Sequence, residues 1–151
     1  MKNKSLCPAC ATVGQRVDNA TIKSIIAVSL HRVSDLVHYF CATSSCDVVY
    51  FALDHSEVFY QAELREQVYQ KMPDADDVLI CYCFLHTVAD VKSSGDEVET
   101  DIRYGIDAGH CACDWRNPQG SCCLGNVIKL RKRNNNPPPT DALCSLTHDY
   151  R

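Results

Sequence analysis

The chain has 151 residues, a formal net charge of −4 and eleven cysteines. This length allows one domain or two small ones, because a single hydrophobic core usually takes roughly 100–150 residues. No apolar run approaches the ~20 residues that a membrane helix needs. The amino-terminal MKNKSLCPAC also lacks the apolar segment of a secretory signal. We therefore expect a protein of the reducing cytoplasm without membrane insertion.

The cysteines favour metal binding over disulfides. An odd number of thiols leaves one unpaired in any disulfide framework, and a reducing compartment disfavours such a framework. The spacings C-x-x-C and C-x-C are typical of thiolate metal sites instead. Four thiolates around Zn²⁺, or around an oxidised two-iron cluster, add about −2 each, so a chain loaded with both carries roughly −8. Nucleic-acid binding is therefore not expected.

The first thiol pair is Cys7 and Cys10, in the tetrapeptide CPAC. Pro8 stiffens the turn, and the backbone N–H groups of such a tight turn point at the sulfurs, as in a zinc knuckle. Redox pairs of the thioredoxin type share the C-x-x-C spacing, but they open a helix after a buried strand. No such strand can precede Cys7, so the spacing favours metal binding.

A helix is predicted over residues 18–31, capped by Asn19 or Thr21, with apolar residues recurring at helical spacing. The segments VHYFC and CDVVYFAL that follow are rich in β-branched and aromatic residues, and they predict a hairpin with CATSSC as its turn. We interpret the nearby His38 and His55 as packing residues rather than ligands.

Cys41 and Cys46 flank this turn and form a second knuckle about 30 residues after the first. Together the two knuckles predict a four-thiolate zinc site. A closed site of this kind is structural rather than catalytic. Its ligands are Cys7, Cys10, Cys41 and Cys46.

The second half is predicted to be mainly helical. We place the boundary between the halves in MPDADD, residues 72–77, after which VLICYC reads as a strand. Two helices follow, capped at Thr87 and divided at Gly95 and Asp96, and the second is expected to bury Val98, Ile102 and Ile106 before Gly109. CACDWRNPQGSCC is expected to be a loop and LGNVIKLRKR a helix. Residues 134–151, which contain the lone Cys144, are expected to be a disordered tail.

Six cysteines of this half lie in CYC and in CACDWRNPQGSCC. Dense soft thiolates suit an iron–sulfur or a zinc site, but only four can hold one small cluster. Cys81 and Cys83 form the first half of the site. Vicinal cysteines rarely both bind one centre, so one of Cys122 and Cys123 is a bystander. The residues alone give no choice between Cys111 and Cys113. Cys123 comes directly before a helix, whose exposed N–H groups favour a negatively charged cluster.

The order CPAC, C-x₄-CDVVYF, CYC and CDWRNPQGSCC resembles the amino-terminal half of the CopZ copper-chaperone family over about residues 5–130. The resemblance implies a zinc module followed by a domain similar to bacterioferritin-associated ferredoxin, which holds a 2Fe–2S cluster. It implies zinc on the four thiols already named and leaves Cys111 and Cys122 as neighbours of the cluster. The implied cluster ligands are Cys81, Cys83, Cys113 and Cys123.

The full chaperones carry a further copper-binding domain with an M-x-C-x-x-C loop, and no such sequence follows Cys123 here. Direct handover of Cu⁺ by that route is therefore not expected. We expect an α+β protein with a β-rich zinc module at 1–74, a helical 2Fe–2S module at 75–133 and a tail at 134–151.

The expected function is redox or electron-transfer assistance in copper handling, with a copper chaperone, a copper ATPase or a redox protein as partner. The alternative is a metal-sensing or redox-sensing binding module in which the cluster is structural. An enzyme in the strict sense is not expected, because the sequence has no phosphate loop, G-x-S-x-G or HExxH motif.

Overall fold

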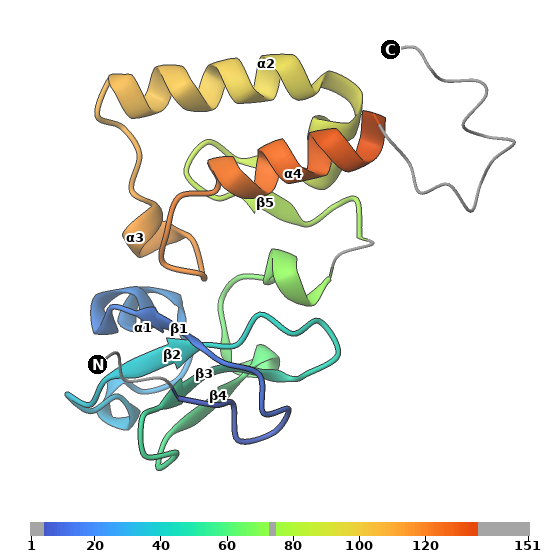
Figure 1. The fold of residues 1–151 in the computed structure, drawn as a ribbon. Coiled ribbons are helices and arrows are strands. Elements are labelled where there is room, and N and C mark those ends of the chain that lie inside the picture. Colours follow the sequence, from blue (N-terminus) through green and yellow to red (C-terminus); the bar gives the residue numbers. More distant parts are fainter. Residues whose placement is uncertain (1–4, 73–74, 136–151) are drawn as a thin grey trace, which may run out of the picture.

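The computed structural model describes residues 5–72 and 75–135, which form an α+β fold (Figure 1). A four-stranded antiparallel sheet occupies one half, in the order β1-β2-β3-β4. The other half consists mainly of two long helices and a small β5-β6 pair. The strands of the larger sheet are β1 Gln15–Val17, β2 His38–Phe40, β3 Val48–Ala52 and β4 Val58–Tyr60.

The predicted hairpin is confirmed as β2 and β3, which pair antiparallel with Tyr39 opposite Phe51. All five residues of β3 are buried, because one face packs on α1 and the other on the amino-terminal turn. Helix α1, Asn19–Ile25, is shorter than predicted. Asp18 caps it, and the chain leaves the helix at Ile26, which is extended and bridges to Leu64. Tertiary strand pairing therefore ends a helix that the apolar spacing alone would extend.

The second half contains β5 Leu79–Cys81, β6 His86–Thr87, α2 Val88–Asp107, α3 Cys113–Arg116 and α4 Leu124–Asn135. The predicted pair of helices is one element, α2, which is kinked at the non-helical Ser94. Thr87 caps it as predicted, in a capping box with Asp90. The expectation that Ile106 is buried is wrong: its side chain is 37% exposed, and the inward position is taken by Gly105 against the Phe84 ring.

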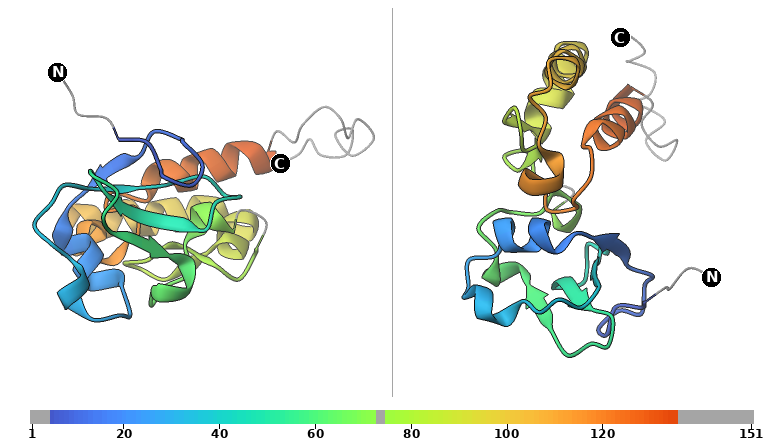
Figure 2. Two further views of the ribbon diagram at one scale, coloured as in Figure 1. Left: turned by 90° about the horizontal axis from the view of Figure 1, so that it is seen from below. Right: turned by 90° about the vertical axis from the view of Figure 1, so that its left-hand side faces the viewer.

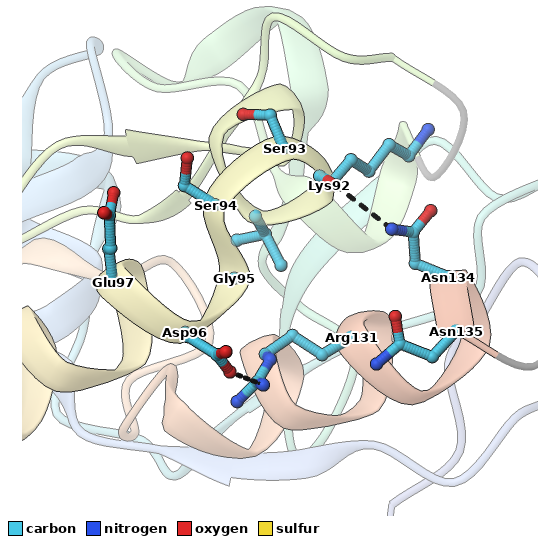
Figure 3. Close-up of a pocket in the computed structure, with 10 residues that line it drawn as sticks. Lys92, Ser93, Ser94, Gly95, Asp96, Glu97, Arg131, Asn134 and Asn135 are labelled. Atoms are coloured by element: carbon cyan, nitrogen blue, oxygen red, sulfur yellow. Dashed lines mark hydrogen bonds and ion pairs between the residues drawn. The ribbon is translucent and has the colours of Figure 1, made fainter. Parts of the chain in front are cut away.

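The kink in α2 faces the end of α4 across a cavity of about 420 Å³ (Figure 3). Arg131 of α4 forms ion pairs with Asp96 and Glu99 of α2. The side chain of Asn134 donates a hydrogen bond to the backbone carbonyl of Lys92, at 3.1 Å. These polar contacts hold the two helices together at the point where α2 loses its regular geometry. No thiol lines this cavity.

The buried hydrophobic residues form clusters within residues 7–68 and a separate cluster within residues 80–130. Helix α3 lies against α1 and connects the two halves (Figure 1; Figure 2, right). The hydroxyl of Thr21 donates to the Asp114 carbonyl, and the buried hydroxyl of Tyr50 donates to the Pro118 carbonyl, each at 2.5 Å. The proposed division at residues 74 and 75 stays a prediction.

The segment 111–123, expected to be a loop, contains the short helix α3. The prediction of a disordered tail starting at 134 is wrong at its first two residues, because α4 continues through Asn135. The rest of that predicted tail, including Cys144, lies outside the described residues.

Candidate metal centres

The first centre is built by two turns that meet beside the four-stranded sheet. Cys7 and Cys10 lie on the turn before β1, which a bridge between Leu6 and Val13 closes. Cys41 follows β2, and Cys46 precedes β3. The four sulfur atoms all lie within 4.8 Å of one another.

The distances within this group match a tetrahedral site. The sulfurs of Cys7 and Cys46 are 3.8 Å apart, and those of Cys10 and Cys41 are 3.6 Å apart. Four sulfurs at about 2.3 Å from one Zn²⁺ at the corners of a tetrahedron lie ~3.8 Å from each other. The four predicted thiols therefore have the spacing and the chemistry of a closed zinc site.

The thiols of this centre ionise in unlike environments. The hydroxyls of Thr12 and then Thr43 lower the pKa of Cys10 to about 5, because they stabilise its thiolate. Burial raises the pKa of Cys46 to about 12, and burial also raises that of Cys7. Metal binding must therefore remove protons from Cys7 and Cys46.

Lys71 is a member of this site that the sequence analysis missed. It lies in the 3-10 turn Tyr69–Lys71, and only 6% of its surface is exposed. Its ammonium donates hydrogen bonds to the sulfur of Cys41, at 3.5 Å, and to the carbonyl oxygen of Thr43, at 2.8 Å. A buried cation beside four thiolates offsets part of their negative charge. No motif marks this residue, because it meets Cys41 only through the tertiary fold.

The interpretation of the two histidines as packing residues is consistent with their contacts. His38 is fully buried, and its ring nitrogens contact Asn19 and Glu57, each at 2.9 Å. The Nε2 atom of His55 lies 2.8 Å from the carbonyl oxygen of Leu6. Neither histidine belongs to a group of three or more metal-ligating side chains within the described ranges.

The second centre brings together five thiols of the other half. The sulfurs of Cys83, Cys111 and Cys113 all lie within 4.8 Å of one another, and those of Cys83 and Cys113 are 3.6 Å apart. Cys81, Cys113 and Cys123 are buried in one core cluster, against which Cys83 and Cys111 pack. The five cysteines thus meet in one part of the core, from β5, the turn after it, the segment that leads into α3, the start of α3 and the residue before α4.

The remaining thiol, Cys122, is exposed on the surface. Its sulfur accepts a hydrogen bond from the backbone N–H of Leu124, at 3.4 Å. Within the described chain, Cys111 is grouped with Cys83 and Cys113 rather than with Cys122. The two cysteines that the resemblance left as neighbours therefore have different surroundings.

The thiols of this centre have pKa values that differ widely. The neighbouring Cys123 thiol stabilises the two thiolates, so it lowers the pKa of Cys113 to about 5 and that of Cys81 to about 7, and its own pKa is raised. Burial raises the pKa of Cys83 to about 12. Soft thiols in this number fit either a 2Fe–2S cluster or another thiophilic metal, so the donor set is compatible with the cluster that the resemblance implies.

The two centres are connected by the segment 67–71. Tyr82, which lies between Cys81 and Cys83, donates its hydroxyl to the Gln67 carbonyl at 2.5 Å and accepts from the Tyr69 N–H at 3.1 Å. At the other end of the segment, Lys71 contacts the first centre. A short stretch of chain therefore touches the cysteine-bearing segments of both sites.

The fold and the four-thiol group define a zinc-binding domain. Residues 4–65 match the family model zf_CopZ, described as a zinc binding domain. Over 128 residues the chain is homologous to the copper chaperone CopZ of Archaeoglobus fulgidus, with 32% identity. That alignment covers 82% of this chain and 60% of the chaperone, so the chain spans about three-fifths of its relative's length.

A solved structure is similar as well. The X-ray structure of the Archaeoglobus fulgidus CopZ N-terminal domain superimposes with a TM-score of 0.68 at 28% identity. The match covers 83% of this chain and 96% of that domain. The predicted likeness to CopZ and the predicted zinc-binding domain are confirmed, whereas the 2Fe–2S module stays a prediction. No helix in 5–72 or 75–135 has the length and apolar character to cross a membrane.

Proposed function

We propose that the protein binds zinc and a 2Fe–2S cluster and assists copper handling by electron transfer. One observation carries this proposal: two segments far apart in sequence, CYC and CACDWRNPQGSCC, bring five cysteines together in one core cluster, three of them with sulfurs within 4.8 Å of one another. Homology to a copper chaperone supports copper as the metal concerned. We expect its partner to be a protein that handles copper, such as a chaperone or a copper ATPase, or a redox protein.

Zinc is proposed to bind Cys7, Cys10, Cys41 and Cys46, where it holds the amino-terminal turn on the β2–β3 hairpin. A metal in such a closed site contributes directly to folding, because the unfolded chain offers no preformed site. Lys71 then serves as a counter-charge to this site, and its two hydrogen bonds hold the segment 67–71 against it.

The cluster is proposed to bind Cys81, Cys83, Cys113 and Cys123. When bound, such a cluster supplies the transfer of one electron at a time, with a potential that depends on hydrogen bonds to sulfur and on exposure. The backbone N–H of Ala112 donates to the sulfur of Cys83 at 3.2 Å. Burial of Cys81, Cys113 and Cys123 excludes water from most of the site, while the half-buried Cys83 leaves one side near the surface.

The test is anaerobic purification followed by an optical spectrum and metal analysis. About two Fe and one Zn per chain are expected. Replacing Cys113 with Ser should abolish the visible absorption, and the matched Cys122→Ser variant should keep it. Cu²⁺ added to the dithionite-reduced and desalted protein should appear as Cu⁺, trapped by bathocuproine disulfonate, at about one ion per chain.

A colourless protein that holds zinc alone, even after reconstitution with iron and sulfide, would refute the electron-transfer proposal. A red-brown protein whose reduced form leaves Cu²⁺ unchanged would support the alternative, a sensing or binding module with a structural cluster.

A further inference from the structure

The second centre contains one thiol more than a four-ligand cluster uses, and that thiol is inside the site. Cys111 shares a group with Cys83 and Cys113, in which all sulfurs lie within 4.8 Å of one another. Cys122 differs from Cys111, because it is exposed and its sulfur accepts a hydrogen bond from a backbone N–H of α4. The position of Cys111 therefore calls for a role that a bystander would not have.

We propose that Cys83, Cys111 and Cys113 form a three-thiolate site for one Cu⁺ ion when the cluster is absent, so that copper and the cluster exclude each other. This inference rests on the proposed ligand set of the cluster. It adds a binding site and a consequence for copper handling that the cluster alone does not provide.

The geometry fits a trigonal soft ion. With metal–sulfur bonds of about 2.3 Å, three sulfurs around one ion lie ~4 Å apart. The sulfurs of Cys83 and Cys113 are 3.6 Å apart, and Cys111 completes the group within 4.8 Å. Small side-chain rotations thus bring all three sulfurs into bonding range. Thiolates are soft ligands and select Cu⁺ over hard cations.

The net charge of the proposed copper site matches that of the proposed cluster site. Three thiolates around Cu⁺ carry about −2, and four thiolates around an oxidised 2Fe–2S cluster also carry about −2. The surrounding groups therefore meet the same net charge in both states. Binding involves no electron transfer: Cu⁺ forms three Cu–S bonds, and those thiols that still carry protons release them to solvent.

The site is accessible to an incoming ion. Cys83 and Cys111 are half-buried, whereas Cys113 is buried. The Ala112 N–H that donates to Cys83 lies between the other two ligands in sequence, so the turn 111–113 wraps around the sulfur of Cys83. Because Cys83 and Cys113 are needed in both states, a bound Cu⁺ ion takes two of the four thiols proposed for the cluster.

The test uses the full chain, cluster-free but with zinc retained, titrated anaerobically with Cu⁺ buffered by bicinchoninate. Wild type is compared with Cys111→Ser, and Cys122→Ser is the matched control. Any Cu⁺ taken up by the four-thiol zinc site is common to all three proteins. Wild type and the control are expected to bind about one more Cu⁺ than Cys111→Ser. The apparent Cu⁺ affinity of Cys111→Ser should be lower than that of wild type by more than the 10–100-fold that loss of an outer-shell partner costs.

A second measurement tests the exclusion. Wild type preloaded with one Cu⁺ should fail to develop cluster absorption with iron and sulfide until bathocuproine disulfonate removes the copper. Equal Cu⁺ isotherms for wild type and Cys111→Ser would overturn the inference, as would full cluster assembly with Cu⁺ still bound. Failure of the wild type to assemble any cluster would refute the proposed function instead, while the titration of cluster-free protein would still decide whether the copper site exists.

Discussion

Replacing Lys71 with Met tests whether the buried ammonium belongs to the zinc site. The substitution keeps an unbranched side chain of similar length but removes the donors to the sulfur of Cys41 and to the carbonyl of Thr43. A zinc ion with four thiolates carries about −2, and two unit charges 4 Å apart attract by ~4 kcal/mol at an effective dielectric constant of 20. Desolvation of the ammonium offsets part of this attraction.

The net effect is estimated from two hydrogen bonds. A hydrogen bond to a charged group contributes about 1.5–3 kcal/mol, and an orphaned buried carbonyl costs about 1–3 kcal/mol. Because Met gains from apolar burial, we expect the zinc-loaded Lys71→Met protein to lose about 2–3 kcal/mol in its free energy of unfolding. Its zinc affinity should fall by about 10–100-fold, as for other outer-shell partners of metal ligands.

The assay is competition for zinc with the chromophoric chelator 4-(2-pyridylazo)resorcinol, together with urea unfolding. The control is Lys129→Met, which removes an exposed lysine from α4. Lys71→Met should release zinc faster and at lower chelator concentration than the control. Equal zinc affinity in Lys71→Met and wild type would refute the assignment of Lys71 as a counter-charge.

Three further predictions concern a buried hydrogen bond, a close packing contact and the release of protons on zinc binding. Tyr50→Phe should lower the free energy of unfolding in urea by about 1–2 kcal/mol, because the Pro118 carbonyl loses its buried donor, whereas Tyr104→Phe, at a 69% exposed position, should change it little. Gly105→Ala should cost about 1–3 kcal/mol, since a Cβ would overlap the Phe84 ring next to Cys83, and Gly125→Ala, where a Cβ meets open space, should not destabilise; equal melting of the two would contradict this packing. Zinc affinity of the metal-free chain, measured by chelator competition, should rise with pH between 6 and 8. The thiols of Cys7 and Cys46 are protonated there and must ionise to bind, and each proton released contributes about tenfold per pH unit, so an affinity independent of pH would contradict the raised pKa values.

Local sequence patterns accounted for much of the fold. Two segments rich in β-branched and aromatic residues predicted the β2–β3 hairpin, and Thr87 marked the start of α2. Both signals are local: a strand and a helix cap depend on residues within a few positions of each other. The ends of α1 and the inner face of α2 were predicted less well. The pairing of Ile26 with Leu64 and the packing of Phe84 on Gly105 join distant residues.

The candidate sites were also predicted from the sequence only in part. Cysteine spacing by itself indicated two thiolate centres and grouped Cys7 and Cys10 with Cys41 and Cys46, because short turns hold each pair together. The spacing left the choice between Cys111 and Cys113 open, and the tertiary structure places both beside Cys83. It also brings Lys71 to Cys41, a contact between residues 30 positions apart. Metal-ligand residues and the turns that hold them depend on short stretches of sequence and can be predicted from it. The positions of a counter-charge such as Lys71 and of an extra thiol such as Cys111 depend on how distant segments pack together, so only the tertiary structure determines them.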